Sequence, residues 1–178
     1  MIKFASELRL KPVLLKREMA LVGIVENLVV NPDDGKLVGV LVREGFGKKD
    51  LKALPEKDII SIASDFYLIS EYGALGEIDE IVRILQVVDR SVRITGAKVY
   101  TVSGKYLGKC RDYSMNLKSM KMEKIYVNPP LFSGVMREYV IGFLQIVSIE
   151  KSKITVEDTF IKSTIPAKGK LADAVNYT

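Results

Sequence analysis

The sequence predicts a mainly β protein made of two similar small antiparallel units with one amphipathic helix between them. Three observations predict it. Residues 20–42 and 58–70 are β-rich apolar runs broken by turn residues, residues 75–88 change to helical spacing, and short sequence matches recur in order about 86 residues apart. A chain of 178 residues with 48% hydrophobic and 28% charged residues is expected to form a packed core, as one medium domain or two small ones.

The first predicted element is a β-hairpin in residues 20–42. Two runs of Val, Leu and Ile flank the sequence Asn-Pro-Asp-Asp-Gly at residues 31–35. Proline presets the first turn angle, and Gly35 supplies a positive φ. Residues 58–70 predict a second pair of short strands, which turn near residues 63–65.

A single amphipathic helix is predicted in residues 75–88, where Leu, Ile and Val recur at helical spacing with charged residues between them. The helix separates two β-rich halves and is therefore the candidate domain boundary. We expect a first unit at residues 1–72, a linker helix at 73–92, a second unit at 93–165 and a flexible tail at 166–178.

Two local matches indicate an internal duplication. IISI at residues 59–62 matches IVSI at 146–149, and LVGIVEN at 21–27 matches YLGKCRD at 106–112. The second match aligns Gly23 with Gly108 and Asn27 with Asp112, whereas Met19 stands where the other half has Gly104.

The repeated segments resemble the PRC-barrel domain. In the second half the resemblance lies in GAKVYTVSGKYLGKCRDYSMN and QIVSIEKSKITVED, and in the first half it lies in residues 21–42 and 54–70. The family includes the cytoplasmic domain of the photosynthetic reaction-centre H subunit and the C-terminal domain of bacterial ribosome maturation factors. The resemblance implies two small closed antiparallel β-barrels in tandem, used as binding surfaces and not for catalysis.

Composition narrows the function classes. The chain has no histidine, which excludes Ser-His and Cys-His nucleophile pairs and histidine-bearing zinc sites, and its lone cysteine excludes a multi-thiolate metal site. We therefore expect no enzyme activity, no metal and no cofactor, although carboxylates alone can still support acid–base chemistry.

Cysteine usage and hydropathy predict a cytoplasmic protein. One cysteine forms no internal disulfide, charges interrupt every apolar run in the first twenty residues, and the longest uncharged stretch, residues 139–149, is shorter than the roughly 20 residues of a membrane-spanning helix. We expect neither a signal peptide nor a transmembrane segment.

The stretch TVSGKYLGKCRD at residues 101–112 has two interpretations. Its G-K-x-x-G-K pattern suggests a phosphate-binding loop, but such a loop opens a helix, and the residues after Gly108 continue as a strand. We therefore favour a hairpin turn at Gly104, with Gly108 at a bend or bulge of the barrel. Strand alternation turns Cys110 inward as a small buried hydrophobe.

Asp112 and its match Asn27 are also predicted to point inward. Their short oxygen-bearing side chains favour a structural role, accepting main-chain N–H bonds at a tight corner, over a ligand contact.

The basic residues cluster in one window. Residues 98–124 hold seven Lys or Arg and two acids, a net charge of +5, so the rest of the chain is nearly neutral. Lys105, Lys109 and Arg111 are predicted to point outward, with tyrosines among them. Such a surface suits phosphate backbones and bases, but we favour a solvated barrel face because no nucleic-acid motif is present.

Two loops present apolar residues beside glycine and proline. Phe46 lies in the first, and Leu131 and Phe132 lie in the second. They either plug the barrel ends or contact a partner, and the plug is favoured. Together these features predict a non-enzymatic adaptor or scaffold that binds a protein partner; the alternative is an RNA- or ribosome-associated factor that uses the basic window.

Overall fold

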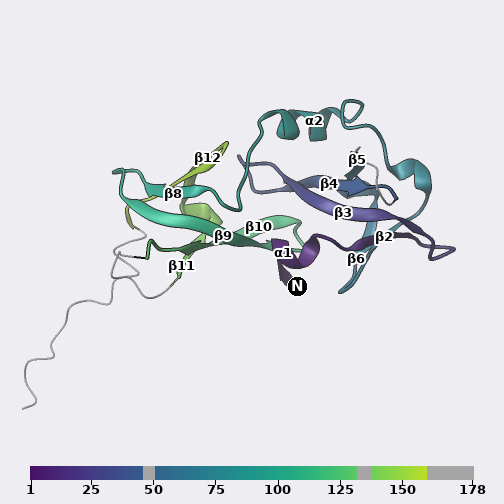
Figure 1. Ribbon diagram of the computed structural model, residues 1–178, viewed down its shortest axis with the longest axis horizontal. Helices are drawn as coiled ribbons and strands as arrows, with labels where there is room; N and C mark the ends of the chain where they lie inside the picture. The colour runs from purple at the N-terminus through teal and green to yellow at the C-terminus, as the bar shows by residue number, and fades with distance from the viewer. Residues whose placement is uncertain (46–50, 132–137, 160–178) are drawn as a thin grey trace, which may run out of the picture.

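The computed structural model describes residues 1–45, 51–131 and 138–159 and shows a mainly β protein with two sheets side by side along its long axis (Figure 1). The first sheet has the strand order β5-β4-β3-β2-β7-β6. Its strands are β2 (Pro12–Leu15), β3 (Leu21–Val30), β4 (Leu37–Arg43), β5 (Leu51–Pro55), β6 (Ile59–Ile62) and β7 (Tyr67–Ile69). The predicted hairpin in residues 20–42 is confirmed as β3 and β4, and the predicted pair in residues 58–70 as β6 and β7.

The second sheet repeats this arrangement in the order β11-β10-β9-β8-β13-β12. Its strands are β8 (Lys98–Thr101), β9 (Tyr106–Asn116), β10 (Lys121–Asn128), β11 (Tyr139–Gly142), β12 (Ile146–Glu150) and β13 (Lys153–Val156). The matched segments fall on equivalent strands, residues 21–27 on β3 and 106–112 on β9, and residues 59–62 on β6 and 146–149 on β12. The common strand order therefore supports the predicted internal duplication.

The strand directions correct one part of the expected architecture. Strands β2 and β7 pair in parallel, and so do β8 and β13, while the other neighbouring strands in the two sheets are antiparallel. Each parallel pair joins the first strand of a unit to its last, so no tight turn has to connect the two. Among the described strands, the ladders end at β5 and β6 in one sheet and at β11 and β12 in the other, so closure into barrels stays a prediction.

Short helices complete the fold. They are α1 (Ala5–Leu8), α2 (Val82–Asp89) and the 3-10 turns η1 (Glu56–Asp58), η2 (Tyr72–Ala74) and η3 (Phe143–Gln145). The prediction of a helix over residues 75–88 is wrong for residues 75–81, because α2 begins at Val82. The main-chain groups of Gly76 bond to those of Ala53 at the edge of β5 (2.9 and 3.0 Å), so Gly76 forms a bridge to the sheet and its own main-chain groups cannot also form helical bonds. Among the described residues, no helix combines the length and the hydrophobicity needed to cross a bilayer.

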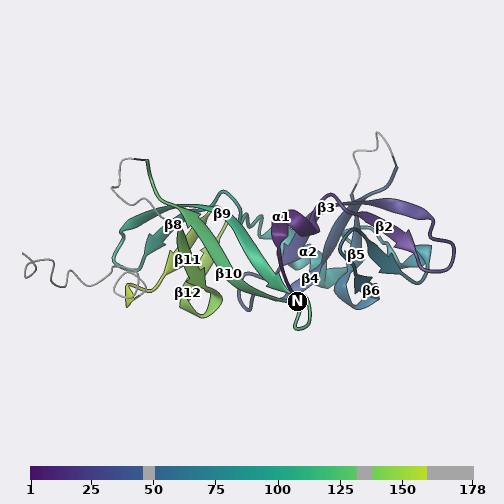
Figure 2. The same ribbon diagram turned by 90° about the horizontal axis from the view of Figure 1, so that it is seen from below.

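The N-terminal segment contacts both halves of the protein. Strand β1 (Ile2–Phe4) pairs with β9 of the second sheet, and α1 follows it into the junction between the halves, as Figure 2 shows from below. Leu8 is fully buried in the hydrophobic cluster of the second half, and its carbonyl accepts a hydrogen bond from the Tyr67 hydroxyl of the first sheet (2.9 Å). The predicted unit boundaries stay a prediction, and the predicted tail at 166–178 lies outside the described residues.

The tip of the β3–β4 hairpin makes a second connection. The N–H of Leu37 donates to the carbonyl of Met120, and the N–H of Met122 donates to the carbonyl of Gly35, both at 2.8 Å. Leu37 is buried in the same cluster as the core of the second sheet. The turn that the sequence predicted only as a local feature is thus also a contact between the halves.

Candidate binding surfaces

Three lysines form one row across three neighbouring strands of the second sheet. Lys153 on β13 lies opposite Lys98 on β8, and Lys98 lies opposite Lys109 on β9. All three are exposed, and none forms an ion pair with a described residue. Like charges at directly opposite positions destabilise a sheet, so this row costs folding free energy that an anionic partner would offset.

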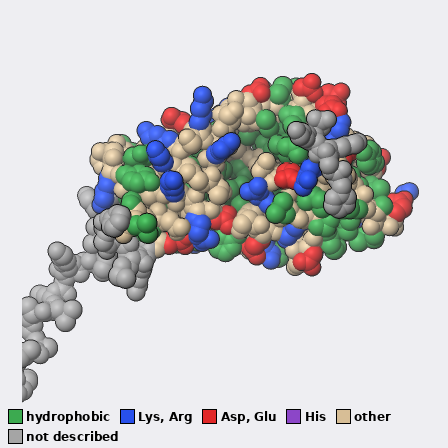
Figure 3. Space-filling model, viewed as in Figure 1, with side chains coloured by type: hydrophobic (Ala, Val, Ile, Leu, Met, Phe, Trp, Pro, Cys, Tyr) green, Lys and Arg blue, Asp and Glu red, His purple; other side chains and the backbone are tan. Residues whose placement is uncertain are grey.

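Two tyrosines lie on the same side of the sheet as the lysine row. Tyr100 follows Lys98 by two residues and lies opposite Tyr106, with ring centroids 5.1 Å apart. The Lys153 ammonium lies 5.7 Å from the centroid of Tyr100. We call Lys98, Lys109, Lys153, Tyr100 and Tyr106 the basic face; Figure 3 shows Lys and Arg side chains gathered over this half of the molecule.

The structure separates the residues that the sequence proposed as a partner surface. Lys109 lies in the lysine row, and Lys105 is exposed just before Tyr106. The Nε of Arg111 instead donates to the Glu138 carboxylate (2.8 Å), which neutralises its charge. Leu131 is 96% exposed, whereas Phe46 and Phe132 lie outside the described residues.

Lys153 lies outside the residues that the sequence singled out, and Lys98 was predicted only as part of the basic window. The two residues are 55 positions apart, and only the parallel pairing of β8 with β13 brings them together. The alternation of side chains along a strand predicts that Lys109 points outward, and the same rule applies to Lys98. This orientation is the one local indication of the row.

The segment at residues 101–112 is a hairpin and not a helix start. Gly104 lies in the turn between β8 and β9, and Gly108 lies beside a register shift between these strands. Gly23 occupies the equivalent place on β3, where an added Cβ would lie 2.6 Å from the carbonyl oxygen of Arg43. Backbone therefore approaches backbone closely at the matched glycines.

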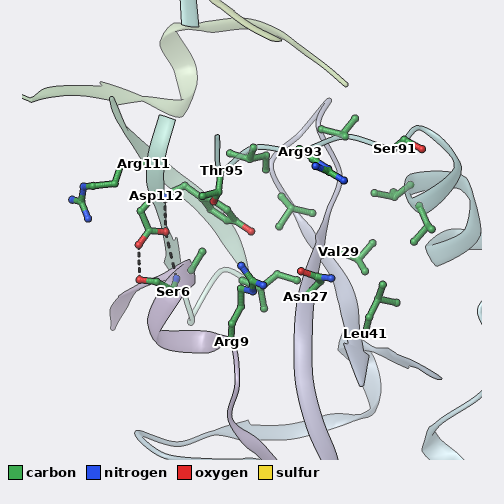
Figure 4. A pocket seen from close by; sticks show the side chains of 18 residues that line it. Ser6, Arg9, Asn27, Val29, Leu41, Ser91, Arg93, Thr95, Arg111 and Asp112 are labelled. Carbon is green, nitrogen blue, oxygen red and sulfur yellow. Dashed lines mark hydrogen bonds between the residues drawn. The ribbon is translucent and has the colours of Figure 1, made fainter. Parts of the chain in front are cut away.

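Between the halves lies a cleft of about 520 Å³, which is the second candidate surface (Figure 4). Segments α1, β3, β9 and the chain that follows α2 line it. The matched residues Asn27 and Asp112 both belong to this lining, although Asn27 is exposed and Asp112 is only 4% exposed. The duplicated positions thus face one shared cavity in different environments.

Asp112 is held by hydrogen bonds from two segments. Its Oδ1 accepts the main-chain N–H of Tyr113 (2.8 Å) and of Ser6 (3.3 Å), and its Oδ2 accepts the Ser6 hydroxyl (2.5 Å). The carboxylate therefore fastens α1 to β9, and these bonds offset the cost of burying it.

The sequence patterns did not indicate two arginines that line the cleft. The Nε of Arg9 donates to the main-chain carbonyl of Glu26 (2.7 Å), and the main-chain N–H of Arg93 donates to the carbonyl of Lys151 (2.5 Å). Neither guanidinium forms an ion pair with a residue that the structure describes. The two arginines are 84 positions apart, so no local spacing pattern placed them together.

Cys110 is buried on β9, and its thiol contacts the main-chain carbonyl of Asp112 (3.3 Å). Burial raises the pKa of the Cys110 thiol to about 12. We expect iodoacetamide to alkylate Cys110 at least about a hundredfold more slowly in the native protein at neutral pH than in concentrated urea. Mass spectrometry of the alkylated fraction over time measures this ratio, and similar rates in the two conditions would show that the thiol is accessible.

No cluster of three or more Asp, Glu or Cys side chains suited to a metal ion occurs within residues 1–45, 51–131 and 138–159. No curated protein matches the chain. The family model described as the PRC-barrel domain matches residues 87–160, a range that contains the complete strand set β8 to β13 and the whole basic face. This match confirms the resemblance to the PRC-barrel domain that the sequence segments of the second half indicated.

Proposed function

We propose that the protein is a non-enzymatic adaptor that binds an acidic protein partner through the basic face of its PRC-barrel domain. The lysine row carries this proposal, since three exposed cations are aligned by strand pairing without acids to neutralise them. The PRC-barrel is a fold used for protein interaction. Complementary charge would give such a surface both partner specificity and fast association.

The proposal includes tandem barrels in the cytoplasm. The first sheet has the strand order of the PRC-barrel domain, including its parallel pair, so we treat it as a second, diverged copy joined through α2. A protein without histidine and with its one cysteine buried has neither an imidazole base nor an accessible thiol nucleophile, which supports a binding role over a catalytic one.

RNA is the second candidate partner, and the tyrosine pair favours it. An exposed ring, Tyr106, and a half-buried one, Tyr100, beside lysines are the elements of a stacking surface for bases with contacts to phosphates. Binding to RNA would weaken steeply with added salt because phosphate contacts release counterions.

Charge reversal on the basic face tests both candidates. The variant Lys98→Glu/Lys109→Glu/Lys153→Glu is expected to bind the partner at least about tenfold more weakly, since each reversal replaces attraction by repulsion. Crosslinking and affinity purification from native lysate of the source cell, with and without nuclease, identify the partner, and titration with that purified partner measures its affinity.

The matched control is Lys16→Glu/Lys57→Glu/Lys118→Glu, which changes the net charge equally at three exposed lysines outside the basic face. A nuclease-resistant protein partner lost only from the first variant supports the adaptor. Material that binds only without nuclease and dissociates with salt supports the RNA alternative. Equal loss from both variants would show non-specific attraction to net charge and would contradict both.

A further inference from the structure

Segments that are hydrogen-bonded to one another or to a neighbouring half line the cleft between the halves. Helix α1 and β9 are fastened by Asp112, β3 lies opposite, and the chain after α2 is bonded to the second half through Arg93 and Lys151. The hairpin contacts of Gly35 and Leu37 hold the two sheets together. Hydrogen bonds therefore connect the segments that line the cavity to both halves of the protein.

The lining combines apolar walls with polar groups. The apolar side chains include Val29, Leu41, Val87, Val88 and Val92. Burial raises the pKa of the Tyr113 phenol, so this part of the wall stays uncharged at neutral pH. A cavity of about 520 Å³ that combines apolar walls with a comparable share of polar groups has the size of a small-molecule site and suits an amphiphilic ligand.

The charge balance of the cleft is positive. Asp112 is the one acid in its described lining, and hydrogen bonds from Ser6 and Tyr113 occupy both of its oxygens. Arg111 also belongs to the lining, but it is paired with Glu138 and points away from the cleft (Figure 4). Arg9 and Arg93 therefore dominate the charge that a ligand would meet.

The guanidinium groups of these two arginines have donors to spare. The Nε of Arg9 donates to the main-chain carbonyl of Glu26, while the Glu26 carboxylate forms an ion pair with Arg43 (2.6 Å). Neither Arg9 nor Arg93 meets a carboxylate among the described residues. The planar donor pair of a guanidinium fits the two oxygens of a carboxylate or phosphate group. Asn27 and Thr95 add polar side chains to the same lining.

From this geometry we infer that the cleft between the halves binds a small amphiphilic anion, with its carboxylate or phosphate head on Arg9 and Arg93 and its apolar body against the valine walls. This activity is independent of the basic face, because the cleft lining and the basic face have no residue in common. The protein would thus respond to a small molecule at the junction of its two halves.

Isothermal titration calorimetry with four probes tests the inference. Octanoate and octyl phosphate carry the two head groups, octanol lacks the charge, and inorganic phosphate lacks the apolar body. We expect at least one amphiphilic anion to bind at a single site, at least about tenfold more tightly than octanol or inorganic phosphate. Binding of octanoate alone or of octyl phosphate alone identifies the head group. Binding of both supports a site that accepts either anionic head group.

Single substitutions locate the site. Arg93→Ala and Arg9→Ala are each expected to weaken the tighter probe at least about tenfold, because a charge-assisted hydrogen-bond pair is lost. Arg17→Ala is the matched control, since Arg17 is exposed in the turn between β2 and β3 and is absent from the cleft lining. Arg93→Ala removes no described side-chain contact, so it remains informative if Arg9→Ala fails to fold.

Four results would overturn the inference. These are no binding of either amphiphile at millimolar concentration, equal binding of octanol, equal binding of inorganic phosphate, and wild-type affinity in both arginine variants. The triple lysine variant of the basic face should keep its affinity for the probe. Arg93→Ala should keep its affinity for the macromolecular partner. The two proposals can therefore fail separately.

Discussion

Replacing Gly108 by alanine is expected to destabilise the protein by about 2–5 kcal/mol. Gly108 has a φ of +136°, a conformation that residues with a side chain rarely adopt. An added Cβ would overlap the carbonyl oxygen of Asn128 and lie 2.8 Å from its carbonyl carbon and 3.0 Å from the Cα of Pro129. These are backbone atoms at the end of β10, so relief requires β9 and β10 to move apart. Urea unfolding followed by far-ultraviolet circular dichroism measures the loss.

The variant Gly104→Ala distinguishes the conformational cost of a positive φ from the cost of steric overlap with Asn128. Gly104 also has a positive φ, +87°, but an added Cβ there would meet no atom within 4 Å. We therefore expect only the conformational cost, about 1–2 kcal/mol. Equal destabilisation by the two variants would show that the approach of Asn128 contributes nothing.

Replacing Leu8 by alanine is expected to cost about 3 kcal/mol of unfolding free energy and to loosen the junction between the halves. Leu8 has no exposed surface, and it packs in a cluster that contains both Leu37 of the first sheet and Met115 of the second. Truncation would leave a cavity where the two cores meet. The urea midpoint and hydrogen exchange of the main chain in α1 and β9 check the two effects.

Leu10→Ala is the control for this substitution. It removes the same atoms two residues later, from a side chain that is 67% exposed. We expect a change within about 0.5 kcal/mol. If both leucine variants unfold at the same urea concentration, the N-terminal segment does not hold the halves together.

Local features of the fold were predictable because local chemistry specifies them. The runs around Asn31 and Gly35 contain both strand-forming residues and turn residues, so the hairpin is encoded within about twenty positions. The helix was predicted too long because Ile78 and Ile81 do pack, partly buried, against the cluster that contains Ile84, although Gly76 is bonded to the sheet edge. Helical spacing indicates which residues are buried and does not specify the backbone that buries them.

The candidate sites were predictable only in part. The outward orientation of Lys109 follows from alternation along one strand, but its neighbours Lys98 and Lys153 depend on pairing between distant segments. Arg111 fits the same local pattern, yet Glu138 pairs with it across the sheet. A side chain's partners are set by non-local contacts, which a single sequence does not display.

By itself the sequence determined a mainly β chain with a repeated strand pattern, a PRC-type second half and a basic window, because propensity, turn chemistry and internal similarity act over short distances. Only the tertiary structure decided that β1 and α1 join the second half, that three lysines align, and that Arg9 and Arg93 line one cleft. Each of these depends on the long-range packing of segments tens of residues apart, which the burial of apolar surface fixes for the whole molecule at once.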